Sequence, residues 1–442
     1  MGQDDTRLRA IIESLRQNDG WRADRSQTVL PKHRKMAGGA FLFLRGAAPL
    51  MYADIAAGRF NLPPDLERVP LTMIMGDCHP ANFGFFTEEG SHGDRVVFSA
   101  NDFDDACVGF AHWDLARFLV GLLMCQQQAQ VGDMAAGCSD DAPANLSPES
   151  LTDSMDAFLD AYLLTCAQCR DDRRAVYRAS HDFADSHILA RAEKKAIKRA
   201  AGGHRFLTKS TLAKEVDVSC LPLRFKDNPA RVVRLAPELY EQLEQALAPY
   251  VDDCILDMVQ RLNAGTGSVN MARYYLLVGP RRQSLASLNL CHIVEVKQQR
   301  QAAPLGCFAG LSAINRLTPA HLTARCQRQM QRSADLVLDD LIWRGQHYLV
   351  RSRHHARVSV DPLALCSLDN QALNQYASAC GEALARIHCR GDRRSNEFEW
   401  QMTQQLPAQR QALVQACLDY AQLIRDDYRR LADLLEPESE HG

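Results

Sequence analysis

Strand-like and helical segments follow one another in an order that leaves few possible folds, because a strand-rich region followed by a helical region occurs twice. Short β-prone segments at residues 71–75, 83–86 and 96–99 are separated by glycine-containing stretches, and helical periodicity then covers 111–125 and 147 to about 205. The second strand-rich region covers 255–297, a further strand is expected at 347–351, and residues 368–435 are again helical. The pattern predicts an α+β fold with two lobes that close on a cleft.

Composition excludes several classes of protein. The 442 residues are 46% hydrophobic and 24% charged, which is typical of a globular chain. Because the net charge is -3, we expect no nucleic-acid partner and no membrane partner. The sequence has no apolar run of roughly 18 residues and no signal-peptide pattern, so we expect a cytoplasmic protein whose 15 cysteines are reduced. Residues 126–148 are expected to form a long loop.

The most informative segment is MGDCHPANFGFF followed by VVFSANDFDDA, and we call residues 77–105 the acidic hairpin. If residues 83–86 pair antiparallel with 96–99, Asn82 and Asp102 meet at the open end, with Asp77 in reach. Two carboxylates and an amide oxygen form an incomplete oxygen shell that suits Mg²⁺ bound also to water and substrate phosphates. By analogy with kinase phosphoryl transfer, Asp77 would position the acceptor hydroxyl, while Asn82 and Asp102 bind metal. The alternative is that these residues only form turns and caps.

Five further residues have two interpretations each. Asp104, like Asp105, either assists the metal or is solvated. His79 either binds metal or holds its loop through hydrogen bonds. Asp114, at the start of a helix, either accepts backbone N–H groups from the Asp77 loop or interacts only with the helix dipole. Arg45 contacts either an anion near the cleft or a structural ion-pair partner.

A glycine-containing turn and a lysine in the second strand-rich region are typical of phosphate binding. Gly265, Gly267 and Ser268 stand between two strand-like runs, where missing Cβ atoms let backbone N–H groups approach an anion. Lys297 ends an apolar strand, from which its ammonium could reach α- and β-phosphate oxygens. The alternative for Lys297 is a charge on an edge strand that discourages aggregation.

These motifs resemble known families. GDCHPANFGFF, NDFDDACVGFAHWDLARF and KMAGGAFLFLRGAA resemble the motifs of an uncharacterised family, domain of unknown function 2252, and the resemblance covers most of the chain, including VEVK and ACGEALARIHCRGD. The GD-x-H-x-x-N pattern and the following Asp are also similar to motifs of aminoglycoside and choline kinase-type phosphotransferases, within the protein-kinase-like superfamily. That second resemblance implies Asp77 as the catalytic residue, Asn82 and Asp102 on magnesium, and Lys297 with the glycine turn on ATP.

In ordinary kinases the glycine turn and lysine precede the catalytic loop, whereas here they follow it, so the implied fold is a two-lobed protein-kinase-like fold with circularly permuted lobe order. Helix 374–388 would take the place of the helix that runs into the catalytic loop. The expected division is an N-terminal helical or extended segment (1–70), a catalytic and metal-binding lobe (71–250), a nucleotide-binding β-rich lobe (251–365) and C-terminal helices on the catalytic lobe (366–442).

Two features depart from the kinase pattern. Asn270 stands at the third glycine position, although Asn accepts left-handed geometry better than most residues. Residues 322–331 contain no glutamate to pair with Lys297, and Arg325 or Cys326 stands there instead. Glu295, on the same strand face as Lys297, is the alternative partner.

The expected function is an ATP- and Mg²⁺-dependent phosphotransferase that acts on a hydroxyl group, with a small molecule as acceptor. The first alternative is a nucleotide-binding pseudokinase, which the missing glutamate favours and the intact acids oppose. The second is an enzyme that transfers AMP from ATP bound in the reverse orientation. A metal-dependent hydrolase fits less well, because the acidic hairpin offers only one suitable histidine.

Overall fold

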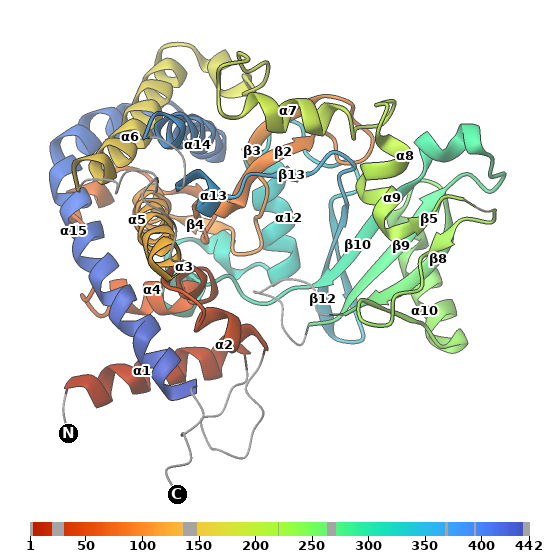
Figure 1. Cartoon of the computed structure of the whole chain (residues 1–442), viewed down its shortest axis with the longest axis horizontal. Coiled ribbons are helices and arrows are strands. Elements are labelled where there is room, and N and C mark those ends of the chain that lie inside the picture. The colour runs from red at the N-terminus through yellow and green to blue at the C-terminus, as the bar shows by residue number, and fades with distance from the viewer. Residues whose placement is uncertain are drawn as a thin grey trace, which may run out of the picture.

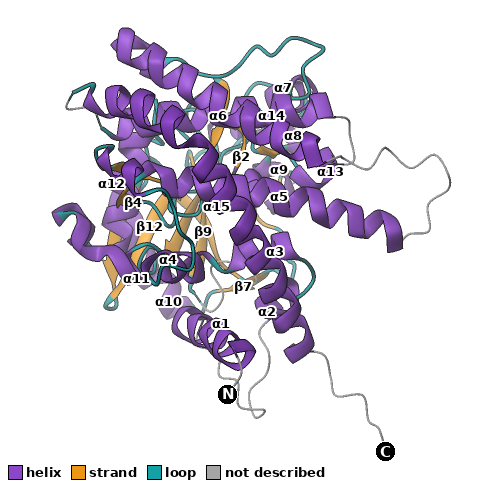
Figure 2. Cartoon of the chain, turned by 90° about the vertical axis from the view of Figure 1, so that its left-hand side faces the viewer, coloured by secondary structure: helices purple, strands orange, loops and turns teal. Residues whose placement is uncertain are grey.

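The computed structural model describes residues 3–19, 31–135, 148–219, 221–262, 271–366, 370–392 and 395–435. A helical part and a six-stranded sheet lie side by side, with a small three-stranded sheet between them (Figure 1). Viewed from the helical side, helices stand in front and the strands lie behind them (Figure 2). The α+β prediction is confirmed.

The helical part is built around helix α5 (Ala111–Ala135), whose first half is buried on every side. Apolar residues occur all round this helix, as expected for one enclosed by other helices. Helix α6 (Pro148–Asp171) and helix α14 (Asn370–Gly391) pack closely, and helix α15 (Glu397–Leu435) contacts both α5 and α6. The N-terminal helices of this part are α1 (Gln3–Asp19), α2 (Pro31–Met36), α3 (Ala40–Gly46) and α4 (Ala48–Ala56).

Two expectations for this region are corrected. Residues 126–135 continue helix α5, because their Gln, Ala and Met residues favour helix, and the rest of the expected loop up to residue 147 lies outside the described residues. The helices expected from 147 to about 205 are one long helix, α6, then turns, and then the short helix α7 (Ala190–Ile197). The helices expected at 111–125 and in 368–435 are confirmed.

The acidic hairpin forms as predicted. Strand β2 (Phe83–Thr87) pairs antiparallel with β3 (Val96–Ala100), with Phe83 opposite Ala100. Strand β13 (Val358–Ser359) pairs with the other edge of β2, and β1 (Thr72–Ile74) pairs with β4 (Cys107–Gly109). Asn82 therefore directly precedes β2 and Asp102 follows β3, so both stand at the same end of the hairpin, as the sequence predicts.

The six-stranded sheet is antiparallel throughout, in the order β11-β12-β10-β9-β8-β7. Its strands, three of which the sequence predicts, are β7 (Val232–Arg234), β8 (Cys254–Arg261), β9 (Arg273–Gly279), β10 (His292–Gln298), β11 (Asp339–Trp343) and β12 (Gln346–Ser352). One face packs against helix α10 (Pro237–Leu247). The other packs against α8 (Phe206–Lys209), α9 (Thr211–Glu215), β5 (Val216–Asp217) and β6 (Arg224–Phe225). Residues 206–247, which precede the expected lobe boundary at 250, thus contribute to both faces.

Helix α12 (Pro319–Met330) and the segment 353–357 lie where the sheet meets the helical part, and the short helices α11 (Leu305–Phe308) and α13 (Pro362–Cys366) complete the described helices. The described cysteines are free and most of them are buried, as expected for reduced thiols that pack as small apolar groups. Within the described part of the chain, no helix combines the length and apolar character needed to cross a membrane.

Candidate active site

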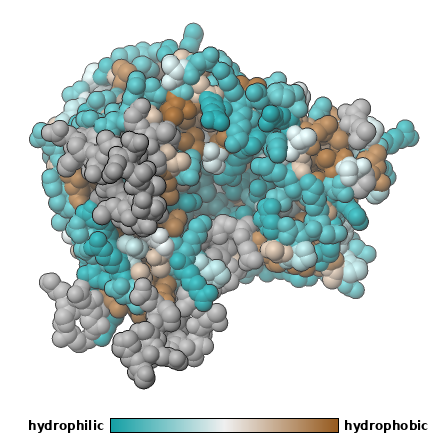
Figure 3. Space-filling view, in the orientation of Figure 1, coloured by the Kyte–Doolittle hydropathy of each residue, from teal (hydrophilic) through white to brown (hydrophobic). Residues whose placement is uncertain are grey.

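A cavity of about 380 Å³ is enclosed between the acidic hairpin and the six-stranded sheet. The hairpin side contributes Asp77, Asn82, Asp102 and Asp104, and the sheet contributes Lys297. In the space-filling view the surface is hollowed between the two parts, and hydrophilic residues dominate around the hollow (Figure 3). The predicted proximity of Lys297 to the acidic hairpin is confirmed, while the roles of these residues stay predictions.

Asp114, the fourth residue of helix α5, fixes the loop that carries Asp77 through hydrogen bonds. Its carboxylate accepts hydrogen bonds from the backbone N–H of Met75 at 2.7 Å and of Gly76 at 3.0 Å. His388 on α14 lies with Nε2 at 3.1 Å from the same carboxylate, and all of these groups are buried. The hydrogen bonds predicted for Asp114 are therefore present, and they fix the backbone just before Asp77.

The Asp77 carboxylate has a partner that the sequence did not assign. Arg117, fully buried on α5, contacts Asp77 Oδ1 through Nε at 2.7 Å and also donates through Nη2 to the backbone oxygen of Leu44 at 2.8 Å. Both ion-pair contacts fall on Oδ1, and Oδ2 lies 3.8 Å from His79 Nε2. Arg117 follows Asp114 by three residues, a spacing that places both on one helix face and could have predicted this pair.

Asn82 and Asp102 offer oxygen atoms to the cavity. The Asn82 amide nitrogen donates to the backbone oxygen of Asp77 at 3.0 Å, so its acceptor oxygen is the group left for a cation. Asp102 Oδ1 accepts the backbone N–H of Asp104 at 3.3 Å. Burial, reinforced by the neighbouring Asp104 carboxylate, raises the pKa of Asp102 to about 6. A divalent cation held by Asn82 and Asp102 would neutralise this carboxylate, so the donor set fits Mg²⁺.

Lys297 pairs with Asp104, and Asp104 also accepts a hydrogen bond from Gln299 at 3.1 Å and lies 3.7 Å from Arg351. Burial alone would raise the pKa of Asp104, but the cations of Lys297 and Arg351 outweigh it and hold the pKa well below its ordinary value. Lys297 is buried on β10, an interior strand of the sheet. The alternative interpretation of Lys297 as an edge-strand charge is therefore wrong.

Glu295 binds three arginines, and the suggestion that it partners Lys297 is corrected. Its carboxylate lies 3.1 Å from Arg273, 3.0 Å from Arg351 and 3.2 Å from Arg353. Burial opposes ionisation, but these guanidinium groups hold the pKa of Glu295 well below its ordinary value. Residues paired across a ladder share a face, so the sheet register places Arg273, Glu295, Lys297 and Arg351 on one surface.

The cavity carries more positive than negative groups, although the whole chain is slightly acidic. Eight Lys or Arg side chains and five carboxylates line it. The cations are Lys35, Arg45, Arg273, Lys297, Arg300, Arg351, Arg353 and Arg357, and the acids are Asp77, Asp102, Asp104, Asp105 and Glu295. Only two of these cations, Arg45 and Lys297, were predicted from the sequence, because the others are brought together by sheet register and chain crossing rather than by spacing. Such a lining suits a polyanion bound together with a metal ion.

His79 and Arg45 lie beside the Asp77 loop. Burial, with Arg45 and Arg117 nearby, holds the pKa of His79 well below its ordinary value, so the imidazole is neutral at pH 7. His79 also packs edge-on against Phe41, with ring centroids 6.0 Å apart. Among the described residues Arg45 forms no ion pair, and its Nε has no hydrogen-bond partner. Arg45 lines the cavity, and its contact with an anion stays a prediction.

The predicted phosphate-binding turn with Gly265, Gly267 and Ser268 lies outside the described residues. Its flanks are described, and they are neighbouring antiparallel strands, because β8 ends at Arg261 and β9 begins at Arg273. Met271, just after the segment, lines the cavity. The segment therefore connects two neighbouring strands of the sheet.

A family model described as "Uncharacterized protein conserved in bacteria (DUF2252)" matches residues 25–434. The match covers nearly the whole chain and all of the site residues named above. No curated protein sequence and no solved structure matches the chain.

Proposed function

Since the chain belongs to the DUF2252 family, whose description states no activity, we propose a function from the geometry of its own cavity: an ATP- and Mg²⁺-dependent phosphotransferase that acts on a hydroxyl group of a small molecule. The observation that carries the proposal is that Lys297 of the sheet and the acidic hairpin meet in one cavity with an excess of cations. Phosphoryl transfer needs carboxylates for metal and acceptor on one side and cations for the phosphates on the other.

Two features of the chain path support a protein-kinase-like fold with permuted lobe order. The glycine-containing segment joins β8 to β9, and Lys297 stands on β10, the next strand, which is the arrangement of glycine loop and lysine strand in protein kinases. Helix α14 ends against β1, since Thr72 Oγ1 donates to the backbone oxygen of His388 at 2.7 Å. A late helix thus leads spatially into the Asp77 loop, as the permuted order requires.

Each site residue has a role under this proposal. Asn82 and Asp102 would hold Mg²⁺, and Lys297 with the arginines of the sheet would hold the phosphates. Bound Mg²⁺ and ATP supply the reactive phosphoryl group and its charge neutralisation. Asp77 orients the acceptor hydroxyl and takes its proton as the acceptor oxygen bonds to the γ-phosphorus and the bond from that phosphorus to the β–γ bridging oxygen breaks. Asp104 holds Lys297 in place until phosphate oxygens replace that contact.

The pseudokinase remains the second candidate, because Arg117 occupies one oxygen of Asp77. Both contacts of Arg117 fall on Oδ1, so only one oxygen of this carboxylate is left to orient an acceptor hydroxyl. Such a protein would bind ATP in the same cavity without turning it over.

Labelled ATP distinguishes these functions. The full chain is incubated with Mg²⁺, a mixture of small hydroxyl compounds, and ATP labelled at either the α or the γ position. Transfer of the γ label to an acceptor is the expected result, and Asp77→Asn should abolish it while Asp94→Asn, on the turn between β2 and β3, leaves it unchanged. Transfer of the α label would replace the proposal with AMP transfer, and tight ATP binding without turnover would replace it with a pseudokinase. Absence of ATP binding by calorimetry would overturn all three.

A further inference from the structure

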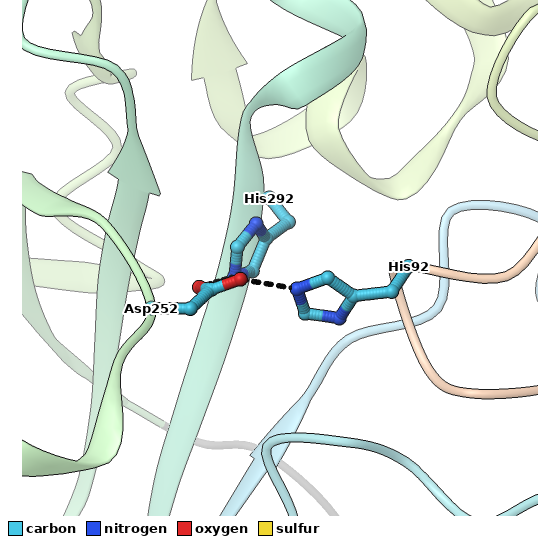
Figure 4. A group of neighbouring side chains, drawn as sticks. All are labelled: His92, Asp252 and His292. Atoms are coloured by element: carbon cyan, nitrogen blue, oxygen red, sulfur yellow. Dashed lines mark hydrogen bonds and ion pairs between the residues drawn. The ribbon is translucent and has the colours of Figure 1, made fainter.

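Three side chains from distant parts of the chain converge away from the cavity just described. His92 lies in the turn between β2 and β3, Asp252 precedes β8, and His292 is the first residue of β10. Figure 4 shows both imidazole rings directed at the Asp252 carboxylate. One potential ligand atom from each residue lies within 4.8 Å of the other two. The distances are 2.5 Å from His92 Nε2 to Asp252 Oδ2 and 3.4 Å from His292 Nε2 to Asp252 Oδ1.

A second observation indicates that this cluster has room for a ligand. The His292 side chain is only 6% exposed, and its Nε2 has no hydrogen-bond partner although it points at the Asp252 carboxylate. A buried ring nitrogen without a partner is unfavourable unless something else binds it. An imidazole nitrogen without a hydrogen-bond partner can present its lone pair to a metal ion.

We propose that His92, Asp252 and His292 bind a transition-metal dication of the zinc class. Two imidazole nitrogens and one carboxylate oxygen are ligands that Zn²⁺ prefers, and water would fill the remaining position of a tetrahedron. Mg²⁺ and Ca²⁺ prefer oxygen ligands and fit this set poorly. The site is therefore chemically different from the oxygen-rich set at Asn82 and Asp102.

The position of the ligands gives the metal a structural role. His92 belongs to the turn of the acidic hairpin, whereas His292 belongs to the strand that carries Lys297 five residues later. One ion bound to both residues ties the hairpin to the sheet at the end of β10 opposite the cavity. This contact holds the two walls of the cavity relative to each other and requires no nucleotide.

Metal titration of the full chain tests this proposal. The chelator-treated protein is titrated with Zn²⁺ and, separately, with Co²⁺, whose visible absorption reports the ligands. We expect one tightly bound Zn²⁺ per chain, and more than about a 100-fold loss of affinity in His92→Ala and Asp252→Asn, because each removes a direct ligand. His321→Ala is the matched control, since His321 also contacts a carboxylate, Asp340, at 2.8 Å but belongs to no such triad.

A stability measurement gives a second readout. Zn²⁺ should raise the melting temperature of the unmodified protein and of His321→Ala by several degrees and should leave His92→Ala unchanged. His92 lies on a surface turn, so its removal is compatible with folding. Equal Zn²⁺ binding by His92→Ala and the unmodified protein, thiolate absorption bands in the Co²⁺ form, or no stoichiometric binding would each overturn the proposal.

Discussion

Asp102 and Asp104 stand two residues apart in one loop, yet their surroundings shift their pKa values in opposite directions. Asp104 is neutralised by Lys297, whereas burial and the charge of Asp104 make ionisation of Asp102 unfavourable. Two neighbouring carboxylates with separated pKa values are typical of functional sites, where one charge is kept for a ligand. Binding of a cation is thus most favourable at the Asp102 carboxylate.

Replacement of Asp102 should stabilise the metal-free protein. At about pH 7.5, Asp102→Asn is expected to raise the free energy of unfolding by on the order of 1–2 kcal/mol, because it removes a carboxylate whose charged form the fold disfavours. The pKa of Asp102 in the folded protein, about 6, lies above the ordinary 3.8. This group therefore contributes stability below the ordinary pKa, and the contribution is lost as the pH rises through about 6.

Urea denaturation in a chelating buffer measures this effect. The gain should shrink by more than half at about pH 4.5, where Asp102 in the folded protein is mostly protonated. Added Mg²⁺ should stabilise the unmodified protein and not the variant. A gain of equal size at both pH values would show that the carboxylate charge is not its cause.

Lys297 is predicted to bind nucleotide phosphates. Lys297→Ala should weaken Mg²⁺-ATP binding by about 10- to 100-fold, the range expected for one charge-assisted hydrogen bond. Isothermal titration calorimetry measures the affinity, and circular dichroism checks that the variant is folded. Lys194→Ala is the control, because Lys194 is exposed and pairs with the surface residue Asp185. An unchanged affinity in Lys297→Ala would remove the lysine from the site.

At the scale of elements, the turn between β1 and the Asp77 loop depends on one glycine. Gly76 has a φ of +73°, and a Cβ at this position would lie 2.0 Å from the backbone oxygen of Asp105. The turn therefore requires a residue without a side chain for two independent reasons. The backbone N–H groups of Met75 and Gly76 in this turn also donate to the Asp114 carboxylate.

Gly76→Ala should cost about 1–3 kcal/mol of stability from backbone strain and should also displace the loop that follows Phe103. Gly202→Ala is a matched control, because Gly202 has a φ of +78° and no atom within 4 Å of an added Cβ. Chemical denaturation should show a larger loss for Gly76→Ala, and Mg²⁺-ATP binding should fall in that variant alone. Equal losses of stability in the two variants would mean that the structure relieves the contact between the added Cβ and Asp105 at no cost in stability.

The parts of the site that the sequence predicted are those formed by local pairing. Phe83 and Ala100 belong to one hairpin, so alternation and turn residues were sufficient to place Asn82 beside Asp102. The contact of Asp114 with the Asp77 loop was one of two interpretations that the sequence left open, because an acid at a helix N-terminus can also interact with the helix dipole alone. The C-terminal end of α5 was not predicted, because its last turns have a composition that loops and helices share.

The arginines of the cavity were not predicted, for a physical reason. Arg273 and Arg351 face Lys297 and Glu295 only because β9 and β12 flank β10 in one particular register. A shift of one residue would turn these side chains to the other face, and nothing local in the sequence fixes that choice. The same dependence on register hid Asp104 as the partner of Lys297.

At the scale of the whole molecule, the two ends of the chain are joined by buried charges. Arg7 on α1 contacts Asp54 on α4 at 2.6 Å and also pairs with Asp427 on α15, and Tyr420 donates to Asp54 at 2.9 Å. The first and last helices therefore form one unit with α4 (Figure 1). Neighbouring first and last helices are compatible with the permuted lobe order proposed above.

Arg7→Met should destabilise the protein by about 3–5 kcal/mol, because it leaves two buried carboxylates without their cation. Arg16→Met is the control, since Arg16 pairs with Glu13 on the exposed side of the same helix. Urea denaturation at neutral pH should show the loss in the first variant and no change in the second. A small loss in Arg7→Met would mean that Asp54 and Asp427 become protonated or hydrated instead.

The 193 positions that separate Asp104 from Lys297 also determine how much time passes between the synthesis of the two residues. At translation rates of about 5–20 residues per second, the ribosome adds Asp104 roughly 10–40 s before it adds Lys297. Helix α14, which contacts β1 and β3, is made later still. The nascent hairpin thus carries Asp104 without its counter-charge for that interval, and this part of the site can form only after Lys297 has been added.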